Sequence, residues 1–559
     1  LLLLTGTAGD YIESIPQVVI IALSASYLVA IFAIPTFSYL FLEPSKNVEK
    51  PSRIKPFFTN LLERAFDHKK ATFAIVLVLI VMAGYLGGNL GLKFFPMADT
   101  DMVYMNITAE SSTSIDETEK IVDQIEAIIE EQPEVVSYTA AIGDGLPKFY
   151  TTLPLSTQSN DYAQIMMKLD LSKTDRFKSN DYFVDYLQNQ IDGAIAEATV
   201  SVRELEQGDP SGSPINVKLT ADSMEELSAV VSELKAVLVN VEGTVGVSDN
   251  LSEEVFEFEV TYDNVAGSYR GVSLYDMEKE IGIALRGKTA SILKNDGDES
   301  PIIVKSDITT KEMLENLEIK STATGQKVLL KDIADVTLVN KSPVIKKVDR
   351  ELSATVSSDV KPGYNSVEIQ NTFDKRIQDL DMQGVNLEYK GEKEKIIDSF
   401  GDMGILSIFS IIIIYGILLI QFNSFKQPII IFAAIPLSVI GSVVGLTLFR
   451  QSLSFTAMLG IVSLFGMVVN NAIILIDYIN GERKEGKDTR TACVDAVGRR
   501  FRPIILTTTT TVIGLIPLVL TGGELFRPMA ISLMFGLLIS MFLTLVLVPI
   551  IYSIFMKSN

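Results

Sequence analysis

The sequence contains one cysteine, Cys493, one histidine, His68, and no tryptophan. A single cysteine cannot form a disulfide within the chain. A single histidine excludes a histidine-rich metal site and leaves almost nothing from which to build a Ser-His-Asp triad. Because the sequence shows neither a nucleophile–base pair nor a metal-binding constellation, it predicts no catalytic site, no metal site and no cofactor.

Basic charge is also scarce, since the formal net charge at pH 7 is −21. The acidic residues are concentrated between residues 98 and 399, whereas the rest of the chain is net positive. A protein that binds nucleic acid needs a basic surface to contact the phosphates. The acidic middle of the chain therefore argues against nucleic acid as a partner.

Hydrophobic residues make up 47% of the chain, and they lie in long runs on both sides of the acidic block. A helix that crosses a bilayer needs about 20 consecutive, mostly apolar residues. Seven segments meet this requirement, so the sequence predicts an integral membrane protein with multiple spans. The predicted spans are residues 15–42, 72–92, 404–422, 427–449, 453–479, 503–522 and 528–556.

Two short loops between predicted spans, residues 43–70 and 481–502, each contain seven lysine and arginine residues. Positive loops generally stay in the cytoplasm. This places the C-terminal Lys557 inside and the acidic block outside. Residues 56–66 of the first loop can form a short amphipathic helix on the membrane surface, although a soluble connector fits the pattern equally well.

The acidic block alternates between strand and helix patterns. Residues 98–207 are predicted to follow the order β-α-β-β-α-β, which is the split βαβ (ferredoxin-like) arrangement. A second unit of this kind begins near residue 214 and resumes near residue 351. The intervening residues contain their own strand and helix patterns, so they are predicted to form a small inserted domain.

Four segments carry a resemblance to a known family. They read QFNSFKQP at residues 421–428, IPLS at 435–438, GMVVNNAIILIDYIN at 466–480 and RFRPIILTT at 500–508. In this order and on these helices, they resemble the resistance-nodulation-division permeases along essentially the whole chain. The resemblance implies secondary transport driven by the proton motive force, in the bacterial cytoplasmic (inner) membrane.

The resemblance also implies an α-helical membrane bundle joined to an α+β extracytoplasmic porter domain. The chain would be the C-terminal portion of a twelve-span protein, beginning at the end of its fifth helix. Such proteins form trimers, and they work with a periplasmic adaptor and an outer-membrane channel. The expected domains are 1–97 (the end of one membrane helix, a full span, a cytoplasmic amphipathic segment and a second span), 98–207 (first porter subdomain), 208–252 with 349–395 (second porter subdomain), 253–348 (docking insertion) and 396–559 (five spans).

The expected substrates are small hydrophobic or amphiphilic compounds. The segments FFPM at residues 94–97 and GDPSGSP at 208–214 resemble the multidrug branch of the family. The metal-exporting branch has methionines along its pathway, and Met105 is one candidate, but a methionine that packs within a strand explains this position better. Heavy-metal export and a non-transporting accessory or scaffold remain the alternatives.

Polar residues within predicted spans are costly in a bilayer and often mark function. The resemblance assigns Asn470, Asn471 and Thr507 to the proton relay. The structural alternatives are polar contacts between helices for the asparagines, and a hydrogen bond to the preceding turn for the threonine. Many relatives have lysine where this chain has Asn470. The paired aspartates of the family lie on a helix outside this sequence.

Residues 144–161 connect two predicted strands of the first porter subdomain. They resemble the flexible loop beside the drug pocket of the family, and Phe149 and Tyr150 are the expected substrate-binding residues. Aromatic side chains offer an adaptable surface to amphiphilic compounds. An ordinary surface loop is the alternative.

Overall fold

The computed structural model describes all residues except 1, 3, 5, 42–54, 111–112, 151–152, 154–157, 208–211, 252–254, 296–297, 342–343, 362, 379, 381, 383 and 557–559. Much of the basic loop 43–70, and Lys557, therefore lie outside the described residues. The chain divides into two compact units, and each is described by itself. One unit contains Leu1–Asn250 and Val348–Asn559, and the other is Leu251–Lys347.

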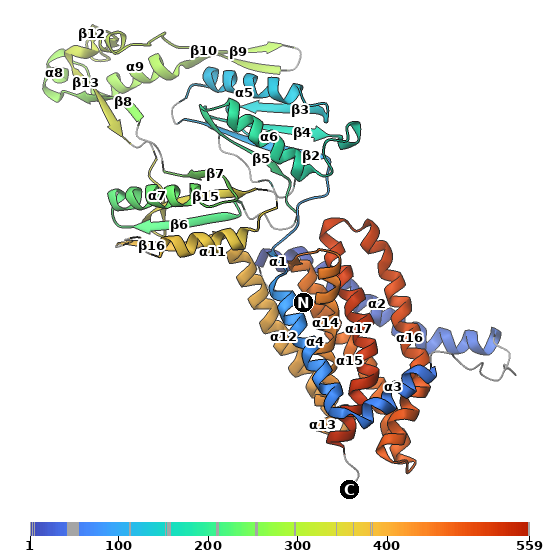
Figure 1. Ribbon diagram of the computed structural model, residues 1–559. Helices are drawn as coiled ribbons and strands as arrows, with labels where there is room; N and C mark the ends of the chain where they lie inside the picture. The colour runs from blue at the N-terminus through green and yellow to red at the C-terminus, as the bar shows by residue number, and fades with distance from the viewer. Residues whose placement is uncertain are drawn as a thin grey trace. The chain divides into compact units, whose positions relative to one another are not determined.

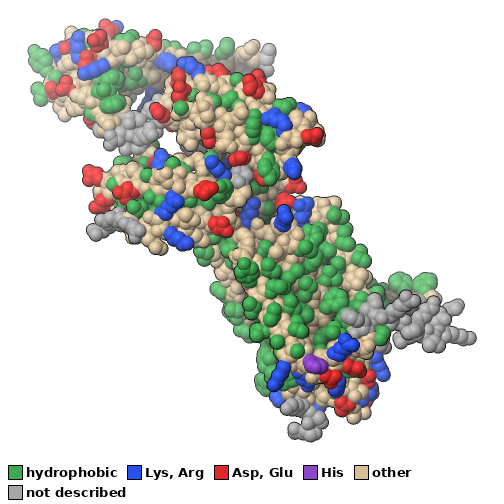
Figure 2. Space-filling view, in the orientation of Figure 1, with side chains coloured by type: hydrophobic (Ala, Val, Ile, Leu, Met, Phe, Trp, Pro, Cys, Tyr) green, Lys and Arg blue, Asp and Glu red, His purple; other side chains and the backbone are tan. Residues whose placement is uncertain are grey.

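Seven helices in the described part of the chain are long and apolar enough to cross a membrane, as predicted (Figure 1). Hydrophobic side chains cover the visible face of this helical part (Figure 2). The helices are α1 with α2 (Gly6–Ile12, Ser14–Phe41), α4 (Lys69–Gly88), α12 (Glu392–Phe422), α13 with α14 (Lys426–Phe432, Ala434–Leu448), α15 (Phe455–Lys484), α16 (Thr489–Thr521) and α17 (Gly523–Phe555).

Helix α17 packs against α14, α15 and α16 at the centre of the bundle. Small residues allow its close approach to α14. A methyl group placed on Gly441 of α14 would lie 2.4 Å from the carbonyl oxygen of Phe535 and 2.8 Å from the Cα atom of Gly536. Close helix contact through small residues is typical of packing within membranes.

Two helices begin before the spans predicted from hydropathy. The spans 503–522 and 528–556 begin at Pro503 and Pro528, but both prolines lie inside longer helices, α16 and α17. Asp488 caps α16, because its carboxylate accepts hydrogen bonds from the backbone N–H groups of Arg490 (3.0 Å) and Thr491 (3.2 Å). Hydropathy marks only the apolar part of a helix, so it missed the polar turns that follow this cap.

The amphipathic segment forms helix α3 (Lys55–Asp67) and packs against the bundle. Phe58, Leu62 and Phe66 are buried in the same core as the membrane helices. The ring of Phe58 lies 4.8 Å from that of Phe501 and 5.5 Å from that of Phe542. One apolar face of this segment therefore contacts protein, while Leu61 stays exposed.

The first sheet has the strand order β3-β4-β2-β5 and is fully antiparallel. Apolar side chains of its strands pack with those of two helices, and Met105 and Met167 belong to this core. Its elements are β2 (Met102–Ala109), α5 (Ile115–Glu130), β3 (Val135–Ile142), β4 (Tyr162–Leu169), α6 (Asn180–Ala194) and β5 (Ala198–Glu204).

The second sheet repeats this pattern, since β6 lies between β15 and β16, and β7 pairs with β15. After β16 the chain passes through Gly391, whose φ of 105° suits glycine, and enters α12 directly. Its elements are β6 (Ile215–Ala221), α7 (Met224–Val239), β7 (Thr244–Asp249), β14 (Lys347–Val348), β15 (Glu351–Val360), α11 (Ser366–Ile377) and β16 (Val385–Gly391).

The unit Leu251–Lys347 leaves the second sheet after β7 and returns before β15. Its strands β8 (Val255–Tyr262) and β13 (Ala334–Lys341) pair antiparallel, and α9 (Leu274–Arg286) contributes Met277 to its own small core. A hairpin of β9 (Lys288–Asn295) and β10 (Asp298–Val304) carries exposed apolar residues such as Ile292 and Ile303.

Candidate functional site

The two asparagines predicted for the relay lie in the middle of α15 but on its less covered side. The opposite side of the helix is buried in the bundle through residues such as Val468, Ala472 and Leu475. Asn470 is exposed and Asn471 is half-buried. Neither amide forms a hydrogen bond within the described part of the chain. Asn470 therefore does not point into the interior of the bundle that the described residues form.

Four threonines of α16, Thr507, Thr508, Thr510 and Thr511, differ in whether their hydroxyl groups form hydrogen bonds. The hydroxyl of Thr507 donates to the carbonyl oxygen of Ile504 (3.0 Å), and the hydroxyls of Thr510 and Thr511 both donate to the carbonyl oxygen of Thr507 (2.9 Å each). Thr508 is only 3% exposed, and its hydroxyl has no partner among the described residues. Thr507, the predicted relay residue, lies on the exposed side of the helix.

Helices α15 and α16 pack together. Across the residues that the structure describes, however, no hydrogen bond joins Thr507 to Asn470 or Asn471. The three predicted relay residues are thus on neighbouring helices, and all keep polar groups available to further partners. A polar side chain that is uncovered within an apolar span is costly unless another group satisfies it.

A cavity of about 870 Å³ lies beside the first sheet. One wall is the end of β5 with the start of α6, including Val202, Glu204 and Asp181. Another wall is the end of β15 and the segment after it, including Asp359 and Tyr364. Cavities of this size are typical of small-molecule sites.

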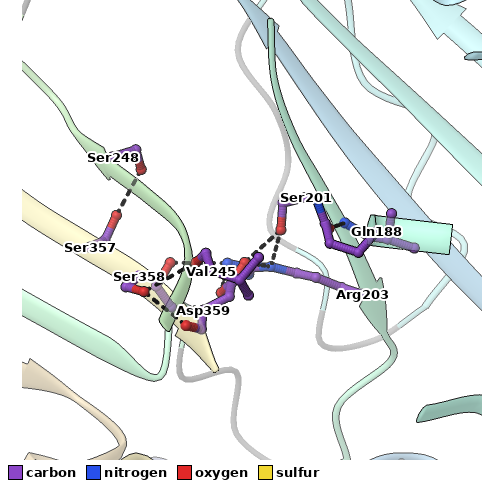
Figure 3. A network of polar contacts seen from close by, with 10 residues as sticks. Gln188, Ser201, Arg203, Val245, Ser248, Ser357, Ser358 and Asp359 are labelled. Atoms are coloured by element: carbon purple, nitrogen blue, oxygen red, sulfur yellow. Dashed lines mark hydrogen bonds and ion pairs between the residues drawn. The ribbon is translucent and has the colours of Figure 1, made fainter. Parts of the chain in front are cut away.

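An ion pair joins the two sheets at this cavity (Figure 3). Arg203 of β5 points to Asp359 of β15, and its Nε donates to a carboxylate oxygen of Asp359 at 2.7 Å, while its Nη2 donates to the other oxygen. The hydroxyl of Ser201 also donates to Asp359 (2.5 Å), and that of Ser213 accepts from Arg203 (3.0 Å). A bidentate contact of this kind fixes geometry as well as charge.

Glu204 follows Arg203 in β5 and also lines the cavity. Burial and the negative charge of Asp181 raise the pKa of Glu204 to about 7, although Lys93 opposes the shift. Its carboxylate makes neither a hydrogen bond nor an ion pair with the described residues. Glu204 is therefore a carboxyl group that exchanges its proton near neutral pH.

Phe149 and Tyr150, the expected substrate-binding residues, are half-buried. They pack on a small apolar cluster that includes Tyr104, Leu153 and Leu205. Neither residue lines the cavity beside β5. Part of their loop, including Pro154, lies outside the described residues.

The methionine considered for a metal pathway is fully buried. Met105 has no exposed surface, and it packs with Ile107 and Ile165 inside the first sheet's core. Among the described residues, no group of three or more His, Cys, Asp or Glu side chains could hold a metal ion. The packing interpretation of Met105 therefore fits the structure.

Sequence reasoning did not identify Arg203, Glu204, Asp359 or Thr508. Asp359 joins Arg203 and Glu204 at the cavity only when the two sheets meet. Thr508 is distinguished from its neighbours by burial alone. A weak signal was present in β5, where the charged pair Arg203-Glu204 ends an otherwise uncharged strand.

Comparisons with known proteins agree with this architecture. The sequence matches the AcrB/AcrD/AcrF family over residues 1–556. It is 27% identical to the swarming motility protein SwrC of Bacillus subtilis (strain 168), in an alignment that covers 100% of this chain and 53% of that protein. It is 24% identical to the multidrug resistance protein MdtC of Proteus mirabilis (strain HI4320), covering 90% of this chain and 49% of that protein.

Two crystal forms of a heavy metal efflux pump share the fold, with TM-scores of 0.75 and 0.74. Each is 20% identical, and each match covers 90% of this chain and 52% of the pump. The chain thus spans about half the length of the curated relatives and solved structures that it matches. The family match over nearly every residue shows that the chain belongs to the AcrB/AcrD/AcrF family of resistance-nodulation-division efflux permeases.

Proposed function

We propose that this chain is the C-terminal portion of a proton-driven permease that exports small amphiphilic compounds across the bacterial cytoplasmic membrane. The observation that carries the proposal is the family match over residues 1–556, together with seven apolar helices that continue into two α+β sheets. A secondary transporter of this kind needs no catalytic residue and no cofactor.

The two sheets and their helices are the porter subdomains in this proposal. The first has the chain order β-α-β-β-α-β, and the second has the same order apart from the inserted unit and the short strand β14. In both antiparallel sheets the first of these four strands lies between the third and the fourth, as in a split βαβ unit. The unit Leu251–Lys347 is the docking insertion. Three copies form a trimer, which works with a periplasmic adaptor and an outer-membrane channel.

Proton coupling involves Asn470, Asn471 and Thr507. These residues leave polar groups uncovered on adjacent helices, which suits contact with a further part of the permease. Carboxylates from that part would accept hydrogen bonds from the asparagine amides when ionised. Asn470 carries no charge, so it cannot neutralise a carboxylate as a lysine would. Protonation of those carboxylates would then alter the packing of the membrane helices and, through α12, the position of the second sheet.

Amphiphiles would pass along the porter subdomains. Phe149 and Tyr150 supply aromatic surface on one side, and the cavity beside β5 offers a second, charged surface. Amphiphiles are favoured over soft metals because Met105, the one candidate for a metal-binding thioether, is fully buried in the core of the first sheet. Metal export would be indicated instead by cells whose resistance to silver or copper depends on the permease and on Met105.

The proposal is tested with the full-length permease in cells that lack other efflux pumps. Cells that carry the Asn471→Ala or the Thr507→Ala permease should accumulate a fluorescent amphiphile to the level of cells without the permease, because each substitution removes a polar group from the relay. Thr521→Ala, the same change at the exposed end of α16, is the matched control and should export normally. Membrane levels and thermal unfolding must match for all variants.

Collapse of the proton gradient with a protonophore should stop export in the unaltered permease. Undiminished export by Asn471→Ala and Thr507→Ala would remove both residues from the relay. A permease that exports nothing in any condition would support the accessory or scaffold alternative.

A further inference from the structure

We propose that Asn365 and Glu392 are positioning residues that connect the second sheet to α15, the helix with the two asparagines of the proposed relay. The inference rests on the proposed function, because it names contacts through which proton movement and substrate movement would be coupled. Helix α12 already joins the second sheet to the bundle, since it continues directly from β16. A second connection runs through the short strand β1 (Leu92–Lys93), which follows α4.

Strand β1 is joined to the start of α15 by backbone pairing. It pairs in parallel with β17 (Leu453–Ser454), and α15 begins at the next residue, Phe455. The N–H group of Leu453 donates to the carbonyl oxygen of Gly91 at 3.0 Å. The N–H group of Phe455 donates to the carbonyl oxygen of Phe94 at 3.1 Å. A displacement of β1 would therefore be transmitted to the first turn of α15.

Three phenylalanines reinforce this joint. The ring of Phe455 lies 5.7 Å from that of Phe94 and 5.2 Å from that of Phe95, and all three side chains are buried. Ile396 of α12 belongs to the same apolar cluster, and Val367 of α11 packs against it. Because a close-packed core transmits strain, the segments that share this cluster resist independent movement.

Asn365 joins the start of α11 to β1. Its Oδ1 atom caps α11, because it accepts hydrogen bonds from the N–H groups of Val367 (3.0 Å) and Glu368 (3.2 Å). Its Nδ2 atom donates to the carbonyl oxygen of Leu92 at 2.8 Å. Gly91 leaves room for this amide, since a methyl group there would lie 3.2 Å from Nδ2. One side chain thus binds a helix terminus and a strand at the same time.

Glu392 makes a second connection to β1. It is the first residue of α12, and its side chain is half-buried. One carboxylate oxygen accepts a hydrogen bond from the N–H group of Phe94 at 2.7 Å, and the other accepts from the hydroxyl of Ser366, the first residue of α11. Hydrogen bonds to an ionised acceptor are stronger than those between neutral groups. This carboxylate therefore holds β1, α11 and α12 together.

Helix α11 belongs to the second sheet's own layer. It lies between β15 and β16 in the chain, contacts α7 and buries Ile369 and Phe373. A movement of the second sheet would carry the start of α11 with it, and Asn365 and Glu392 would transmit the movement to β1. Asn470 lies about four turns along α15 from the joint. The contacts thus form a continuous physical connection between the second sheet and the proposed relay.

Asn365→Asp is the most selective test of this connection. Aspartate keeps the oxygen that caps α11 and suits a helix N-terminus, but an ionised carboxylate cannot donate to the carbonyl oxygen of Leu92. A purely structural role in capping α11 therefore predicts no defect. Glu392→Gln weakens the connection from α12, because an amide offers one acceptor oxygen in place of two. Asn386→Asp, the same change at an exposed position of β16, is the matched control.

The full-length permease is reconstituted in liposomes that contain a pH-sensitive dye, and proton movement down an imposed pH gradient is measured with and without Nile red, a neutral fluorescent amphiphile. Antiport predicts that Nile red accelerates proton movement. This acceleration should occur in the unaltered permease and in Asn386→Asp, and it should be lost in Asn365→Asp and in Glu392→Gln. Proton movement above that of empty liposomes should persist in both of these variants, because their relay residues are intact.

Undiminished acceleration in Asn365→Asp and Glu392→Gln would overturn the inference and leave the proposed function standing. Loss of all proton movement in both variants would also overturn it, because the defect would then lie in the relay or in the fold. If the unaltered permease shows no proton movement that depends on Nile red, the proposed function itself fails, and the inference fails with it.

Discussion

Replacing Asp359 with alanine removes the acceptor on which three hydrogen bonds between the two sheets converge. The side chains of Arg203 and Asp359 are 21% and 13% exposed, so water can only partly replace the lost contact. Removal of one partner from a buried ion pair costs about 3–5 kcal/mol. Given the partial exposure, we expect the lower end of that range, about 3 kcal/mol.

The double variant Arg203→Met, Asp359→Ala tests the physical reason for this loss. Most of the cost in the single variant comes from an arginine that is left buried without its counter-charge. Removing that charge as well should restore about half of the lost stability or more, since apolar replacement of a buried pair is often close to neutral. Stability is measured as the hydrogen-exchange protection of peptides from β5 and β15 in the purified permease.

Glu388→Ala is the control, because Glu388 pairs with Lys218 at 3.2 Å but its side chain is 55% exposed. Its loss should cost no more than about 0.5 kcal/mol. The reasoning is refuted if the single and double variants lose the same protection, because Arg203 and Asp359 would then not be energetically coupled.

Two further predictions concern the bundle and the cavity. Gly441→Ala should destabilise the permease by about 1–3 kcal/mol in thermal unfolding, because the new methyl group meets the backbone of α17 at Phe535, whereas Gly514→Ala, with open space around it, should not. Equal effects of the two alanines would contradict the described packing. The pKa of Glu204 is raised from the ordinary value of 4.5 to about 7 in the folded state. Between these two pH values, the folded state therefore binds this proton more tightly than the unfolded state. Stability relative to Glu204→Gln should therefore fall as the pH rises through this window, and a constant difference between the two proteins would contradict it.

The sheets could be predicted from sequence because their side chains alternate between inside and outside. Ile215, Val217 and Leu219 of β6 are fully buried, while the residues between them are not. The periodicity of a strand is a local property, so no knowledge of the partner strands is needed to identify it.

The candidate site was much less predictable. Arg203 and Asp359 are separated by 156 positions, with an inserted unit between them, and nothing local to either residue indicates the contact. Thr507 and Thr508 are adjacent and identical in type, and successive helix positions point about 100° apart. Only the rotation of α16 against its neighbours decides that Thr508 is the buried one, and this rotation is set by packing along the whole helix.

The pairing of β8 with β13 has a consequence for how the chain folds. Roughly 100 residues separate β7 from β15, and closing so long a loop is entropically unfavourable for the second sheet. Val255 and Lys341 pair near the two ends of the inserted unit, so once that unit is folded its ends are already close together. The effective loop then shrinks to on the order of ten residues, which lowers the entropic cost of joining β7 to β15 by about 2 kcal/mol. Early folding of the insertion would thereby accelerate assembly of the sheet that contains Asp359.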